Sequence, residues 1–99
     1  MLDKLSSADF LPYLHQPFRI RLEGLEPIEL ELVSVTESGD SPRAGQRRPF
    51  SLQFLGPVSP KYLLQRTYAL EHAQMGLLEL FIVPLGPENQ RMRYEAIFN

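Results

Sequence analysis

The residues suited to acid–base chemistry lie around a predicted hairpin in the last third of this sequence. Glu71 and His72 are adjacent, and Glu79 follows a few residues later. If the two glutamates face each other, repulsion between like charges raises the pKa of one carboxyl group, as in many catalytic sites. A tolerated pair of exposed carboxylates gives the same pattern, and we favour that interpretation. The Glu71/Glu79/His72 region remains the alternative site, for a small ligand-binding protein or an enzyme.

Three arginines, Arg43, Arg47 and Arg48, form a second candidate site. Guanidinium groups bind phosphate and other anions through paired hydrogen bonds. The net charge of −2 and the lack of interleaved aromatic residues argue against nucleic acid as the partner. The surrounding Ser, Gly, Pro and Gln residues predict a long loop over residues 37–49, in which solvated charges are the simpler interpretation.

Other chemistries lack the residues that they require. The 99 residues include no cysteine, which excludes disulfides and thiolate sites. The two histidines, His15 and His72, have no catalytic motif beside them, and no cluster has metal-ligand spacing. The glycine patterns of phosphate-binding loops are also missing. We therefore expect no catalytic residue, no metal and no cofactor, and a protein that is not an enzyme.

Strands must position these side chains. Period-two alternation of apolar and polar residues predicts strands over residues 18–22, 28–35, 50–54, 68–73, 77–85 and 91–98. A short helix is predicted from an Asp9 cap to about His15, because Pro12 then falls in the first turn. The sequence predicts one domain over residues 1–99, all-β and mainly antiparallel. About six strands form either a small barrel or a two-sheet sandwich.

The alternation also predicts registers. In the first hairpin we pair Leu22 with Ile28, which sets Arg21 against Glu29 and Arg19 against Glu31. In the second, a left-handed Gly76 closes a short loop and Leu70 pairs with Leu80, so Glu71 faces Glu79. Near Val33, where the apolar residues change face, we expect either a bulge or a bend of the sheet across the core. Gly56-Pro57 is expected to end the third strand.

Composition suggests the compartment. Met1 to Leu5 lack the order of a signal peptide, and the longest apolar run is far shorter than the ~20 residues that cross a bilayer. We expect a cytoplasmic protein without a membrane partner. Because the sequence ends on a predicted strand, we also expect a small β module that is complete in itself.

Several sequence blocks resemble a family of small bacterial single-domain proteins, a domain of unknown function. The blocks are PFRI at 17–20, FSLQFLGP at 50–57, YALEH at 68–72, GLLELFIVP at 76–84 and the ending RYEAIFN at 93–99. The resemblance covers the chain except residues 37–49. It implies no catalytic residues, and it implies an association with phage-tail-related genes.

The function that we expect from the sequence is non-catalytic binding or assembly, through a protein partner or self-association. Sheet edges would supply the interface, because unpaired strands accept strands from other chains. The predicted interface residues are the three loop arginines with Arg93 and Tyr94, since Tyr and Arg are enriched at binding hot spots. Tyr94 lying in the core is the alternative.

Overall fold

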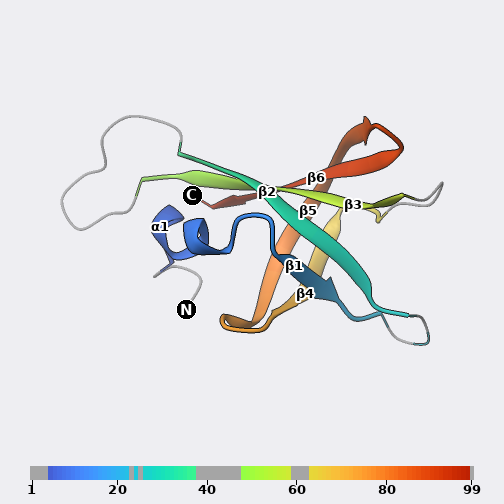
Figure 1. The fold of residues 1–99 in the computed structure, drawn as a ribbon, viewed down its shortest axis with the longest axis horizontal. Coiled ribbons are helices and arrows are strands. Elements are labelled where there is room, and N and C mark those ends of the chain that lie inside the picture. The colour runs from blue at the N-terminus through green and yellow to red at the C-terminus, as the bar shows by residue number, and fades with distance from the viewer. Residues whose placement is uncertain (1–4, 23, 25, 38–47, 59–62, 99) are drawn as a thin grey trace.

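The protein is a closed barrel of six antiparallel strands with one short helix before it (Figure 1). A computed structural model describes residues 5–22, 24, 26–37, 48–58 and 63–98. Its elements are α1 (Ser7–Phe10), the 3₁₀ turn η2 (Leu11–Tyr13), β1 (Pro17–Ile20), β2 (Ile28–Glu37), β3 (Phe50–Val58), β4 (Arg66–His72), β5 (Gly76–Glu88) and β6 (Arg91–Phe98). The predicted fold class is confirmed, and the structure selects the barrel over the sandwich.

The barrel consists of two consecutive three-stranded halves. Strands β1, β2 and β3 pair in sequence order, and so do β4, β5 and β6. The halves meet along most of β3 and β6, from Phe50–Phe98 to Val58–Arg91. On the other side β1 and β4 meet at two residue pairs, Arg19–Glu71 and Ile20–Leu70. The two halves are therefore joined by one long strand pairing, β3 with β6, and one short pairing, β1 with β4. We call the short β1–β4 pairing the seam.

Both predicted hairpin registers are wrong by two residues. In the first hairpin Ile20 pairs with Ile28 and Arg19 with Glu29, because β1 ends at Ile20. In the second, Leu70 pairs with Leu78 and Glu71 with Leu77. A shift of two leaves every side chain on its predicted face, so alternation alone cannot detect it. The left-handed conformation of Gly76 is confirmed by its φ of 79°.

Two bulges bend the strands and help the sheet to close into a barrel. The register shifts between Leu32 and Ser34 in β2, so of the two alternatives expected near Val33 the structure shows the bulge. A second shift lies between Leu55 and Val58 in β3. The prediction that Gly56-Pro57 ends β3 is wrong: the strand continues, because Pro57, which has no N–H to donate, lies in the bulge. Arg91 Nε donates to the carbonyl oxygen of Gly56 at 2.6 Å and stabilises this bulge.

The helix closes one end of the barrel, beside the C-terminal end of β6 (Figure 1). Its N-cap is Ser6, not Asp9 as predicted, because Asp9 occupies the third helical position and accepts from the backbone N–H of Ser6 at 2.8 Å. Pro12 lies in the 3₁₀ turn that follows. Phe10 is fully buried against Phe50 and Phe98, with ring centroids 5.8 and 5.6 Å away. In the described residues no helix has the length and apolar character to cross a membrane.

Candidate functional site

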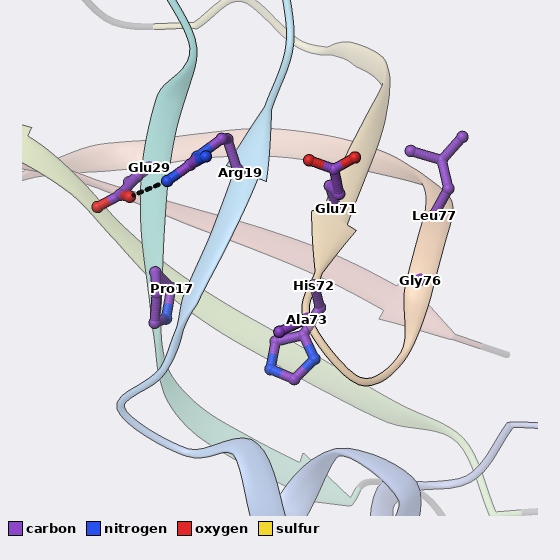
Figure 2. Close-up of a pocket in the computed structure, with 8 residues that line it drawn as sticks. All are labelled: Pro17, Arg19, Glu29, Glu71, His72, Ala73, Gly76 and Leu77. Atoms are coloured by element: carbon purple, nitrogen blue, oxygen red, sulfur yellow. Dashed lines mark hydrogen bonds and ion pairs between the residues drawn. The ribbon is translucent and has the colours of Figure 1, made fainter.

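A pocket of about 450 Å³ lies at the seam, where β1 and β4 diverge (Figure 2). We call it the seam pocket. It is lined by Pro17 and Arg19 of β1, Glu29 of β2, Glu71 and His72 of β4, Ala73 in the following turn, and Gly76 and Leu77 of β5. The pocket therefore combines charged side chains from three strands with an apolar side chain from a fourth.

The charges of the pocket form one row across neighbouring strands. Register pairs run from Glu29 to Arg19, from Arg19 to Glu71 and from Glu71 to Leu77. Arg19 Nη2 donates to Glu29 Oε2 at 2.9 Å, and this interaction raises the pKa of Arg19, with a smaller contribution from Glu71. Glu71 forms its own ion pair with Arg21 at 3.2 Å. Each carboxylate of the row thus has an arginine partner. Glu29 was predicted to face Arg21 and pairs with Arg19, whereas Glu71 was predicted to face Glu79 and pairs with Arg21.

His72 points away from this row, toward the barrel interior (Figure 2). It is 4% exposed, and burial lowers its pKa. Its ring lies against Phe18 and Tyr13, with centroids 4.6 and 4.4 Å away. Nδ1 accepts the backbone N–H groups of Gln74 and Met75 at 3.1 and 3.2 Å. Because the Nδ1 lone pair is already occupied by two backbone N–H groups and the ring is buried, His72 is unsuited to act as a base on a ligand in the pocket.

The Glu71–Glu79 pair predicted from the sequence does not form. Glu79 pairs with Ala69 and is exposed, while Glu71 pairs with Leu77. The two glutamates are apart because the register of the β4–β5 hairpin is shifted by two residues from the predicted one. The structure brings Glu71 and His72 to one pocket, but Glu79 is not among the residues that line it.

The predicted interface residues are scattered. Arg43 and Arg47 lie outside the described residues, and Arg48 forms an ion pair with Glu37 at 3.8 Å. Arg93 donates to Gln53 and, at 2.7 Å, to Glu88. Strand β6 lies between β3 and β5, so it is not the free edge that we expected. Tyr94 is 3% exposed and lies in the core, which was the alternative.

Tyr94 makes a contact that can be tested. Its hydroxyl oxygen accepts the backbone N–H of buried Leu63 at 2.8 Å. Tyr94→Phe leaves this N–H without its partner, so we expect a loss of about 1–3 kcal/mol in the free energy of unfolding, measured in urea. Tyr13→Phe is the control, because no hydrogen bond of the Tyr13 hydroxyl is seen among the described residues. Equal, small losses in both variants would show that the Tyr94 contact does not stabilise the fold.

Sequence reasoning missed Arg19, Glu29, Pro17 and Leu77 as members of the site. Arg19 and Glu29 were assigned to a solvated sheet face, and Leu77 to ordinary alternation. What joins them is the pairing of β1 with β4, between segments that are distant in the sequence. The sequence contains no local signal of that pairing.

Comparison with known families gives one match. The model of a domain of unknown function, DUF6916, matches residues 5–98. The chain belongs to the DUF6916 family. No curated protein and no solved structure matches it. The resemblance to a domain of unknown function that covers nearly the whole chain is therefore confirmed.

The chemistry open to this DUF6916 barrel follows from the geometry. Within the described ranges no group of three or more His, Asp or Glu side chains could hold a metal ion. The seam pocket presents paired charges and the exposed side chain of Leu77, which is 65% exposed. Such a surface can bind a partner through apolar contact and be oriented by the charges around it.

Proposed function

We propose that this DUF6916 protein is a non-catalytic binding or assembly module, and that its contact surface is the outer face of β5 and β6. The observation that carries the proposal is a set of exposed apolar side chains, Leu77 and Phe81 on β5 and Ile97 on β6. They are 65%, 51% and 61% exposed. We call these three residues the β5 surface.

The register places these side chains on the same face. Val83 of β5 pairs with Glu95 of β6. Phe81 lies two residues before Val83, and Ile97 lies two residues after Glu95. Because side chains two residues apart on a strand share a face, both project from the outside of the barrel. Phe81 and Ile97 therefore lie side by side, and Leu77 shares their face with the exposed Glu79 between it and Phe81. Neighbouring large exposed apolar residues are typical of interaction sites.

The occupant that we propose is a second copy of the chain. Among the described residues the six strands close into a barrel whose shortest pairing is the two-pair seam, so association through side chains on the outer face is favoured over strand addition. The β5 surface has apolar side chains of the kind that anchor such contacts, Phe81 above all.

Light scattering over a wide concentration range tests self-association. We expect a dimer or larger assembly, and we expect Phe81→Ser to weaken it at least tenfold, because loss of a central aromatic anchor commonly costs that much. Leu64→Ser is the control, since Leu64 is 69% exposed but lies outside the β5 surface. A monomer at every concentration would rule out self-association, and equal effects of both substitutions would exclude the β5 surface.

We propose a phage-tail-like particle as the setting of this assembly, on the strength of the sequence resemblance alone. The test is to purify such particles from cells that produce both the particles and a tagged form of the protein. We expect the tagged protein to sediment with the particles, and expect Phe81→Ser to reduce the amount bound. Particles that consistently lack the protein would contradict this setting without touching the self-association result.

A second candidate function is the binding of a small ligand in the seam pocket, which the pocket volume favours. Titration of the ¹⁵N-labelled protein with a fragment library distinguishes the two. Shifts confined to the amides of His72, Ala73, Gly76 and Leu77 would support a ligand site. Shifts absent there at millimolar fragment would contradict it.

A further inference from the structure

His72 connects the turn between β4 and β5 to the segment that precedes β1. Its Nδ1 atom faces two backbone donors, the N–H groups of Gln74 and Met75. An atom that accepts from two N–H groups carries no proton itself. The proton of the neutral ring is therefore on Nε2, which donates to Oε1 of Gln16 at 2.8 Å. The surrounding backbone thus selects a single tautomer.

The partners of His72 are themselves held in place. The carbonyl oxygen of Gln16 accepts the N–H of Leu32 at 3.2 Å, and the N–H of His15 donates to the carbonyl oxygen of Leu32 at 2.6 Å. The ring is packed between Tyr13 and Phe18. Because both sides are fixed, His72 cannot rotate to present a different nitrogen to the turn without losing these contacts.

We propose that His72 is a proton-sensitive anchor of the β4–β5 turn, and that protonation of Nδ1 releases this turn. A proton taken from solvent occupies the Nδ1 lone pair, and the ring then directs an N–H toward two other N–H groups. Three donors cannot share that space, so the two hydrogen bonds of the turn are lost. The imidazolium also places a charge in a site that is 4% exposed, which is costly without a paired anion.

Among the residues that the structure describes, the charged groups near His72 do not supply that anion. Glu71 is adjacent on β4, but its carboxylate points the opposite way and pairs with Arg21 (Figure 2). Glu29 of β2 is paired with Arg19 of β1. The side chains that contact the ring from the preceding segment and β1 are Gln16, Tyr13 and Phe18, which are uncharged.

The pH window follows from the direction of the shift. Burial holds the pKa of folded His72 below its usual value of 6.5. The unfolded chain therefore binds a proton more readily than the folded chain, and stability falls as the pH drops below about 6.5. Each unit by which the two pKa values differ changes the folding equilibrium tenfold. Above that pH the anchor contributes fully.

The first test is an NMR titration of the protein alone. At pH 7.5 we expect Nδ1 of His72 to resonate as an unprotonated nitrogen and Nε2 as a protonated one. From pH 7.5 to 5 we expect hydrogen-exchange protection at Gln74 and Met75 to fall about tenfold after correction for intrinsic rates, since two hydrogen bonds are lost. A protonated Nδ1 at pH 7.5, or a titrating His72 with unchanged turn amides, would overturn the proposal.

Two variants test whether His72 is the group that causes the pH response of the turn. His72→Asn keeps an oxygen acceptor near the Nδ1 position that cannot be protonated, so we expect the loss of protection to disappear. His15→Gln removes the other histidine, which is exposed, and is expected to keep the wild-type response. A pH response that survives in His72→Asn would refute the anchor. If that variant does not fold, the titration of the wild-type protein still distinguishes a proton-sensitive anchor from a purely structural histidine.

The consequence for binding rests on the proposed function, because Leu77 of the β5 surface is the second residue of the strand that follows the turn. We expect self-association at pH 7.5 to weaken at pH 5 in the wild type and in His15→Gln, but not in His72→Asn. An unchanged assembly with a released turn would refute regulation of the surface and leave the anchor intact. Absence of association at any pH would instead refute the proposed function.

Discussion

Replacing Phe10 with alanine is expected to lower the free energy of unfolding by about 3–5 kcal/mol, the largest effect of any single substitution proposed for this barrel. Phe10 is fully buried and touches both rings of the stacked pair Phe50–Phe98, whose centroids are 4.5 Å apart. Alanine would leave a cavity at the end of the barrel that the helix closes. Domains of this kind are typically stable by 5–15 kcal/mol, so the variant approaches the limit of folding.

Urea unfolding followed by circular dichroism measures this effect. Leu11→Ala is the matched control, because Leu11 is the next residue and is 48% exposed, and we expect a change below about 1 kcal/mol. Phe10→Leu keeps most of the apolar volume and is expected to lie between the two. Should Phe10→Ala prove as stable as Leu11→Ala, the helix would not close the barrel as described.

Replacing Gly56 with valine is expected to cost about 1–3 kcal/mol through overpacking. Gly56 is buried in the β3 bulge, and a Cβ atom there would lie 3.1 Å from Cε2 of Tyr94. That ring cannot easily withdraw, because its hydroxyl is bound to the N–H of Leu63. Valine adds two methyl groups beyond the Cβ, so either Tyr94 or the bulge must move.

The same urea experiment measures the effect. Ser51→Val is its control, since it introduces the same β-branched side chain on the same strand at a half-buried position. We expect Ser51→Val to be neutral within about 0.5 kcal/mol. We also expect part of the cost at Gly56 to be relieved in the Gly56→Val/Tyr94→Phe double variant, because the ring is then free to shift. Additive losses would contradict the proposed coupling.

The sequence predicted the class of fold because alternation defines which side chains point inward. Phe18, Leu70 and Phe98 are buried as that pattern requires. It could not define the hairpin registers, since a shift of two residues preserves both faces. Nor could it reveal that Gly56-Pro57 bends β3 rather than ending it, because the contacts that stabilise the bulge come from Arg91 on a distant strand.

The candidate site was predicted only in part for the same reason. Glu71 and His72 were singled out by residue type. Arg19 and Glu29 joined them through the β1–β4 pairing, which brings together segments with no local link. The burial of His72 and the tautomer that it adopts depend on Gln16 and on the turn backbone, which no spacing along the sequence indicates.

The two strand pairings that join the halves of the barrel differ in length, and this difference determines where the barrel opens locally. The long pairing of β3 with β6 resists separation, whereas the two residue pairs at the seam are the least costly to break. We therefore expect thermal fluctuations to separate β1 from β4, with the β3–β6 pairing acting as the hinge between the two halves. Ile20 and Leu70 are fully buried in the closed barrel and would be the first core residues to become exposed to solvent. We therefore expect water to reach the interior of the barrel first at the seam pocket.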